Sequence, residues 1–165
     1  YPENFVQRGY ALSIMKPFYE YKNASKVEKN FAKFLNNIND GVEWWYKNGE
    51  RDGTFFAVPR KDRKDDVPFY VDWIVKFKDD RIGLFETKAG ITAETAKTRA
   101  EGLAAYLSEQ NKRGKSYTVN HKRYEGKNLF GGIVIEKNDH FWLNSNEEYE
   151  YDEHDLLNTG WKQLN

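Results

Sequence analysis

Apolar residues follow helical spacing in two segments of the chain. In the first segment they are Val27, Phe31, Phe34, Leu35 and Ile38, which would form one buried face. Ser25 and Glu28 match a capping box, so we expect a helix that begins there and ends at residues 39–41. A second apolar stripe, made of Ala93, Ala96, Ala100, Leu103, Ala104 and Leu107, predicts a helix over about 92–111. A short helix is also expected within residues 10–16, before Pro17.

Strand-like runs fill much of the remaining chain. We expect strands at residues 42–47, 54–58, 69–77, 82–88, 129–135 and 140–143, with a short one near 117–119. The polar stretch 60–67 is expected to be a loop. The order of helix, strands, central hairpin, helix and strand predicts an α/β sandwich with a mixed sheet flanked by helices.

Charged residues interrupt the two central runs, 69–77 and 82–88. Asp72 lies inside the first run, and Glu86 and Lys88 lie at the end of the second. A charge in a buried strand is costly unless it is paired or binds a metal. Glu-x-Lys alone is common by chance, and an isolated strand carboxylate usually faces solvent or forms a salt bridge. Asp72 in the neighbouring run makes a functional site the better interpretation.

Strand alternation predicts where these side chains lie. Glu86 and Lys88 share one face with Ile82 and Leu84. If the short polar loop between the runs holds an odd number of residues, Asp72 falls opposite Glu86 or Lys88 in an antiparallel hairpin. Two carboxylates at that spacing repel unless one is protonated or a cation lies between them, and Mg²⁺ suits such a site. Lys88 would stabilise an anionic nucleophile or transition state.

Composition narrows the function classes. The 165 residues fit one domain, and 26 basic side chains balance 26 acidic ones, so nucleic-acid affinity would have to come from local patches such as 60–64 and 112–127. The chain has no cysteine and three scattered histidines, which excludes thiol chemistry and gives little support to a histidine metal site. No apolar run suits a membrane span and no signal peptide is visible, so we expect an intracellular, cytoplasmic protein.

The ordered set of motifs resembles the PD-(D/E)xK nuclease superfamily. It resembles most the nuclease domain at the C-terminal end of type III restriction subunits and related DEAD/DEAH-box helicases. The resemblance rests on Tyr70–Val75 and Glu86–Gly90, with Ser25, Glu28 and Phe31, then Trp44–Asn48 and Leu129–Ile133, and it covers most of 17–135. Val71 departs from the family, which has a proline there. That proline is a backbone detail and not a ligand.

The resemblance implies a restriction-endonuclease-like fold with an α-β-β-β-α-β core over about 25–143, in a single nuclease domain at 1–165. Asp72 and Glu86, joined by the backbone carbonyl of Thr87, would hold Mg²⁺, for which Mn²⁺ could substitute. Lys88 would orient the attacking water and stabilise the phosphate. Glu28 matches a first-helix glutamate that often completes the metal site, although its capping box explains it equally well. The candidate DNA phosphate contacts are Lys47, Arg60, Lys61 and Lys97.

The expected function is that of a Mg²⁺-dependent endonuclease acting on DNA. The chain lacks helicase motifs and begins at Tyr1, so we expect a longer parent chain with a helicase/ATPase region, and a modification or specificity subunit as a further partner. One alternative is a catalytically silent module that only binds nucleic acid or a partner protein. Another keeps the chemistry but acts on branched DNA or single-strand ends.

Overall fold

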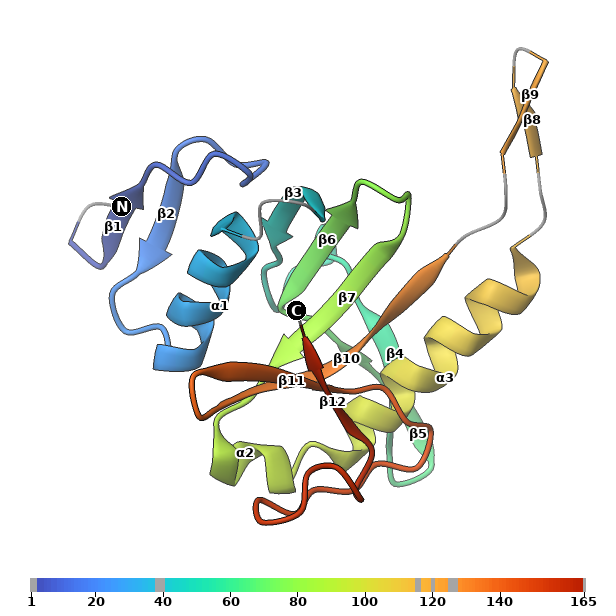
Figure 1. The fold of residues 1–165 in the computed structure, drawn as a ribbon. Helices are drawn as coiled ribbons and strands as arrows, with labels where there is room; N and C mark the ends of the chain where they lie inside the picture. The colour runs from blue at the N-terminus through green and yellow to red at the C-terminus, as the bar shows by residue number, and fades with distance from the viewer. Residues whose placement is uncertain (1–2, 38–40, 115–116, 120, 125–127, 165) are drawn as a thin grey trace.

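In this computed structural model, a mixed sheet forms the centre of the molecule (Figure 1). The structure describes residues 3–37, 41–114, 117–119, 121–124 and 128–164. For residues 117–119 and 122–124 it describes the backbone and not the side chains. Among these residues the main sheet has six strands in the order β12-β11-β10-β7-β6-β3. Their bounds are β3 Val42–Lys47, β6 Trp73–Phe77, β7 Ile82–Thr87, β10 Leu129–Lys137, β11 His140–Asn144 and β12 Trp161–Leu164. The predicted mixed α/β class is therefore confirmed.

Helices cover both faces of this sheet. Helix α1 (Lys26–Asn37) packs Phe31 against Trp73, Phe85 and Phe141, with ring centroids 5.5, 5.9 and 5.2 Å apart. Helices α2 (Gly90–Glu94) and α3 (Lys97–Arg113) cover the opposite face, where their alanines and leucines meet side chains such as Leu84 and Ile133. The central strands read as nearly continuous apolar runs because both of their faces are buried.

The pairing of β7 with β10 is parallel, and all other neighbours in the main sheet are antiparallel. A parallel pair needs a long crossover, which α2 and α3 supply. Gly131, with φ +147°, permits the close approach of the two strands, since a Cβ there would lie 1.9 Å from the carbonyl oxygen of Leu84. The crossover thus returns the chain beside the strand that carries Glu86.

The polar stretch 60–67 is not a loop, contrary to expectation. It forms most of a hairpin, β4 (Val58–Asp62) and β5 (Asp65–Phe69), in which Pro59 lies opposite Pro68. A two-stranded hairpin tolerates proline because its outer backbone groups need no sheet partner. The strand predicted at 54–58 is correspondingly wrong except for Val58, and β6 begins at Trp73 instead of residue 69.

The helix predicted over 92–111 is interrupted at Thr95–Ala96. The Tyr149 hydroxyl donates a hydrogen bond of 2.7 Å to the Ala93 carbonyl oxygen, which a continuous helix would use for the amide of Lys97. Tyr149 is remote in sequence, so the apolar spacing of the alanines carries no sign of the break.

Both ends of the chain contain strands that the sequence analysis missed. A hairpin of β1 (Phe5–Arg8) and β2 (Phe18–Tyr21) precedes α1, and β12 extends the main sheet near the C-terminus. Residues 11–16 form turns and one bridge between Ser13 and Trp45, so the short helix expected there is wrong. The strand expected near 117–119 is confirmed as β8 (Tyr117–Val119), which pairs with β9 (Lys122–Tyr124) in a hairpin that projects from the body in Figure 1.

No helix in the described parts of the chain is long and apolar enough to cross a membrane. The basic stretch 112–127 falls largely outside the residues whose side chains the structure describes.

Candidate active site

The predicted antiparallel pairing of the two central strands is confirmed. Trp73 pairs with Phe85 and Ile74 with Leu84, so Asp72 and Glu86 are the residues that follow this ladder at its end, and their charges interact. Asp72 immediately precedes β6, and Glu86 lies within β7. Their side chains are 14% and 6% exposed, so both carboxylates are largely removed from water.

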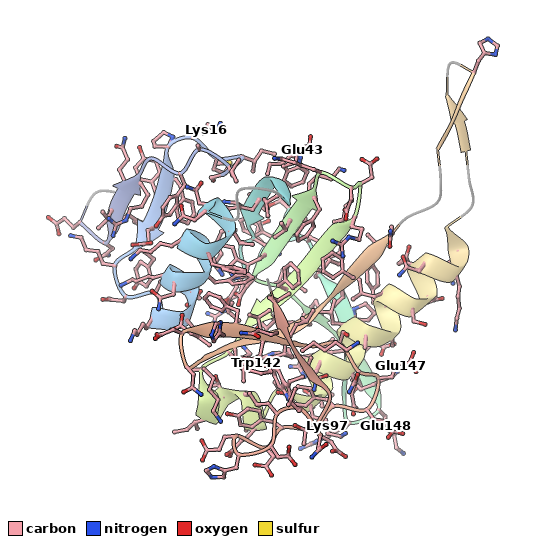
Figure 2. The ribbon with its side chains drawn as sticks, in the orientation of Figure 1. Lys16, Glu43, Lys97, Trp142, Glu147 and Glu148 are labelled. Atoms are coloured by element: carbon pink, nitrogen blue, oxygen red, sulfur yellow. The ribbon has the colours of Figure 1, made fainter. Side chains whose placement is uncertain are left out.

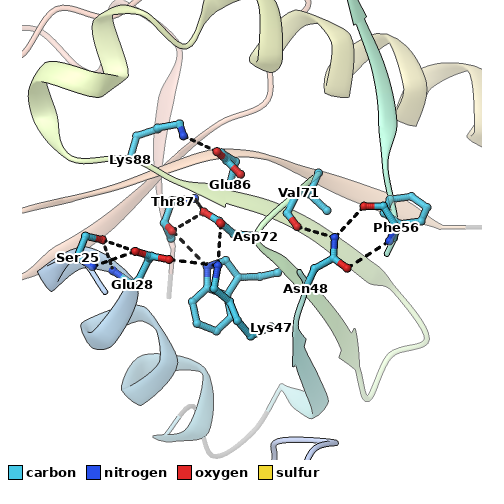
Figure 3. A network of polar contacts seen from close by, with 11 residues as sticks. Ser25, Glu28, Lys47, Asn48, Phe56, Val71, Asp72, Glu86, Thr87 and Lys88 are labelled. Carbon is cyan, nitrogen blue, oxygen red and sulfur yellow. Dashed lines mark hydrogen bonds and ion pairs between the residues drawn. The ribbon is translucent and has the colours of Figure 1, made fainter. Parts of the chain in front are cut away.

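Asp72 is held by three hydrogen bonds (Figure 3). Its Oδ1 accepts from Lys47 Nζ at 2.7 Å, and its Oδ2 accepts from the amide and the hydroxyl of Thr87 at 2.9 and 2.8 Å. Burial acts against ionisation of the carboxyl, but Lys47 and Thr87 outweigh it, so the pKa of Asp72 lies below its ordinary value. Asp72 is therefore a fixed anion at neutral pH.

Glu86 has a different environment. Its Oε1 pairs with the Lys88 ammonium group, and its buried Oε2 has no hydrogen-bond partner. Burial and then the negative charge of Asp72 raise the pKa of Glu86 to about 7, although Lys88 and Arg99 act in the opposite direction. The carboxyl groups of Asp72 and Glu86 thus differ in their affinity for a proton, and Glu86 Oε2 has no hydrogen-bond partner.

Lys47 lies between two acidic side chains. Sheet alternation puts it on the α1 face with Trp45, and its Nζ pairs with Glu28 Oε1 at 3.2 Å as well as with Asp72. The ammonium group also lies 5.0 Å from the centroid of the Trp73 ring. Burial alone would lower the pKa of Lys47, but the charges of Asp72 and Glu28 raise it. Lys47, expected to contact phosphate, is in this structure an internal counter-ion.

Glu28 forms the predicted cap and also an ion pair with Lys47. Its Oε2 accepts hydrogen bonds from the amide and hydroxyl of Ser25 at 3.0 and 2.8 Å, and the Ser25 hydroxyl accepts the Glu28 amide at 3.2 Å. The predicted capping box is confirmed. Its other oxygen contacts Lys47, so Glu28 reaches Asp72 only through that ammonium group.

The remaining predicted DNA contacts lie in separate places. Lys61 pairs with Asp66 across the exposed β4–β5 hairpin, at 2.7 Å. Lys97 lies at the start of α3 (Figure 2) and pairs with Glu101. Arg60, on β4, lines a polar pocket that also contains Glu86 and Lys88.

Three residues contribute to the site in ways that the sequence analysis missed. The Asn48 side chain donates to the Val71 and Phe56 carbonyl oxygens at 2.9 and 2.7 Å, and its backbone amide donates to the Asp72 carbonyl oxygen at 2.8 Å. Asn48 therefore fixes the segment that presents Asp72. Thr87 orients the Asp72 carboxylate through its hydroxyl, and Arg99 lies close enough to Glu86 to lower its pKa. The sequence signal for Arg99 was its position as a basic residue beside the apolar stripe of the second predicted helix.

The fit of Mg²⁺ can be tested on these contacts. Within the described ranges, no group of three or more acidic or histidine side chains is arranged to hold a metal ion. Mg²⁺ is often held by only one or two carboxylates, with water and phosphate oxygens completing its shell. Asp72 and Glu86 supply two adjacent carboxylates, and the buried Glu86 Oε2 still needs a partner. The pair fits a divalent cation that takes the place of the Lys47 ammonium group at Asp72 Oδ1. Glu28 could join the cation only if it also gave up its ion pair with Lys47.

An apolar cavity borders the same cluster. Its volume is about 640 Å³, and it extends from Glu28, Lys47 and Trp73 to the aromatic side chains of the β1–β2 hairpin. The carboxylate cluster therefore adjoins open space on the α1 side as well as the polar pocket beside Glu86.

No protein-family model, no curated protein and no solved structure matches this chain. The chemistry of Asp72, Glu86 and Lys88 and their arrangement at the end of two paired strands carry the functional interpretation.

Proposed function

We propose that this chain is a Mg²⁺-dependent endodeoxyribonuclease domain with a restriction-endonuclease-like fold. The observation that carries the proposal is the proximity of Asp72, just before β6, to Glu86 on the neighbouring strand β7, with Lys88 paired to Glu86 and one buried Glu86 oxygen atom without a partner. A helicase/ATPase region of the parent chain would deliver the DNA, and a modification or specificity subunit is a further expected partner. We place the protein in the bacterial cytoplasm within the same proposal.

The proposed ligands of Mg²⁺ are Asp72 and Glu86, with the Thr87 carbonyl and Glu28 as further candidates and Mn²⁺ as a substitute. When bound, the metal would supply charge compensation for the scissile phosphate and a nucleophilic water at neutral pH. Thr87 and Lys47 keep the Asp72 carboxylate ionised and oriented. The Lys88 ammonium group is a positive charge held in place beside Glu86, suited to stabilising charge that develops on the phosphate.

The internal ion pairs favour one alternative, a nuclease-like module that is catalytically silent. Lys47 and Lys88 already neutralise much of the acidic cluster without a metal. Such a module would keep the fold and bind nucleic acid or a partner protein without cleaving DNA. The enzyme instead has in its favour that the unpartnered Glu86 Oε2 lies beside a second carboxylate, Asp72, whereas Glu20 Oε2, which is also buried without a partner, belongs to a separate ion pair with Arg8.

Metal titration and a nuclease assay separate the two candidates. Isothermal titration with Mn²⁺ and Mg²⁺ should give heat of binding for the wild-type protein and much less for Asp72→Asn. Linear, circular and branched DNA should be cleaved with Mg²⁺ or Mn²⁺ and left intact with EDTA. Cleavage of circular DNA would identify an endonuclease, and a strong preference for branched DNA or free single-strand ends would redefine the substrate. If the protein binds neither Mg²⁺ nor Mn²⁺ and cleaves none of these DNAs, it is the silent module.

A further inference from the structure

A polar pocket of about 160 Å³ lies on the α3 side of Glu86. Its walls come from distant parts of the chain: Arg60 on β4, Arg99 on α3, Lys88 after β7, and Phe69 and Tyr70 at the end of β5. Three cationic side chains from three separate elements therefore face one small space next to the candidate active site.

The positive charge in this pocket is not balanced from within. Lys88 pairs with Glu86, but within the described chain neither Arg60 nor Arg99 forms an ion pair with a carboxylate. Arg60 has a 3.5 Å contact with the Thr98 hydroxyl, and the Arg99 guanidinium lies 5.9 Å from the centroid of the Phe69 ring. The other acidic residue of the lining, Glu50, is exposed to solvent. Two half-buried guanidinium groups are thus available to an anion.

Close packing holds the two arginines in register. Gly102 lies one turn after Arg99 on α3, and a Cβ there would lie 2.7 Å from the Pro59 carbonyl oxygen and 3.0 Å from Arg60 Cα. Helix α3 can approach β4 this closely only because position 102 has no side chain. The approach brings Arg99 and Arg60 to the same pocket before any ligand arrives, which reduces the entropy lost on binding.

The chemistry of the pocket specifies its ligand. Guanidinium groups present paired N–H donors that match the oxygens of a phosphate, and backbone phosphates provide most protein contacts to DNA. We propose that this pocket binds a backbone phosphate of a nucleic-acid strand through Arg60 and Arg99, so that a neighbouring phosphodiester lies at Asp72 and Glu86. Only the position of the neighbouring phosphodiester at Asp72 and Glu86 rests on the proposed nuclease function. Arg60 and Arg99 are binding and positioning residues here, while Lys88 remains in the catalytic cluster.

The test measures DNA binding apart from cleavage. Arg60→Gln and Arg99→Gln are made in an Asp72→Asn background, and the fluorescence anisotropy of a fluorescein-labelled DNA duplex is followed in EDTA over a series of salt concentrations. Arg81→Gln is the matched control, because Arg81 lies in the turn between β6 and β7, outside both basic patches, and pairs with Asp79. Inorganic phosphate is added as a competitor to distinguish a site for free phosphate from one for the strand.

Each glutamine variant should weaken duplex binding about tenfold or more, the loss expected for a charge-assisted hydrogen bond. Each should also reduce the slope of log K against log salt concentration by about 0.9, since one phosphate contact is lost. Arg99→Lys should keep most of the salt slope, and Gly102→Ala should weaken binding by separating α3 from β4. Arg81→Gln should bind like the parent protein, and inorganic phosphate should compete only weakly.

Unchanged affinity and slope in Arg99→Gln would overturn the inference, as would equal losses in Arg81→Gln, strong competition by inorganic phosphate, or no duplex binding by the parent protein. These outcomes are separable from the proposed function. If the wild-type protein cleaves DNA and Arg99→Gln binds normally, the phosphate pocket is wrong and the nuclease stands. If DNA binding depends on Arg60 and Arg99 but no cleavage occurs with any metal, the pocket stands and the nuclease does not.

Discussion

Glu86→Gln should make the protein more stable at neutral and alkaline pH. The carboxyl of Glu86 titrates at about 7 in the folded protein, against 4.5 for an ordinary glutamate, because burial and Asp72 disfavour its charge. Glutamine keeps the shape of the protonated group and cannot ionise. The variant therefore removes a buried negative charge whose second oxygen atom has no partner.

The magnitude follows from proton linkage. Below pH 4.5 Glu86 is protonated in both the folded and unfolded states and costs nothing. Between pH 4.5 and about 7 the unfolded chain releases the proton while the folded protein retains it, so wild-type stability falls as pH rises. Each pKa unit corresponds to about 1.36 kcal/mol, which gives a loss of about 3 kcal/mol that persists above pH 7. Glu86→Gln should lack this contribution.

The assay is urea unfolding of both proteins in EDTA, at several pH values from 4 to 8, followed by circular dichroism. The difference in unfolding free energy between Glu86→Gln and wild type should grow by about 3 kcal/mol across this range. Glu101→Gln is a suitable control, because the Glu101 carboxylate has a lowered pKa and should show no gain toward alkaline pH. If the unfolding free energies of Glu86→Gln and wild type changed in parallel with pH, Glu86 would not be a carboxyl group that is partly protonated near pH 7.

Three further predictions test other parts of the structure. Lys47→Met should destabilise the protein by about 2 kcal/mol at pH 7 and by much less at pH 3. The lowered pKa of Asp72 provides stability that is present above the unfolded value of 3.8 and is lost as pH falls. Urea unfolding at the two pH values measures the difference, and an equal loss at both would contradict it. Mn²⁺ should raise the melting temperature of the wild-type protein and not of Asp72→Asn, and EDTA should reverse the rise; a calorimetric shift of equal size in both proteins would place the metal elsewhere. Phe31→Ala should cost about 4 kcal/mol in chemical unfolding, because its ring contacts four other aromatic rings, and a loss below about 1 kcal/mol would mean that α1 packs differently.

Local patterns were sufficient to predict the geometry of the two carboxylates. The β6–β7 turn is short and polar, so the register that brings Asp72 close to Glu86 depends on adjacent residues alone, although the Asp72 carboxylate turns toward Lys47 and Thr87. Helix α1 was predictable for the same reason, since its capping box and apolar spacing lie within one segment.

Contacts between distant segments were beyond such patterns. Lys47 pairs with Asp72 and Glu28 only because β3 lies beside β6 at the edge of the sheet and α1 crosses that edge. The β4–β5 hairpin has a polar composition and two prolines, which predict a loop when the sequence is considered alone. Arg99 could not be connected with Glu86 before the packing of α3 against β4 was known.

The most direct test of the central claim is DNA cleavage by Asp72→Asn compared with wild type and with Asp79→Asn. Asp79 is a matched control because it is an exposed aspartate in the turn of the same hairpin, paired with Arg81. In Mg²⁺ at neutral pH, wild type and Asp79→Asn should cleave duplex DNA at similar rates, and Asp72→Asn should be slower by at least about 100-fold while it unfolds cooperatively like the others. Cleavage by Asp72→Asn at the wild-type rate would contradict a nuclease centre at Asp72 and Glu86.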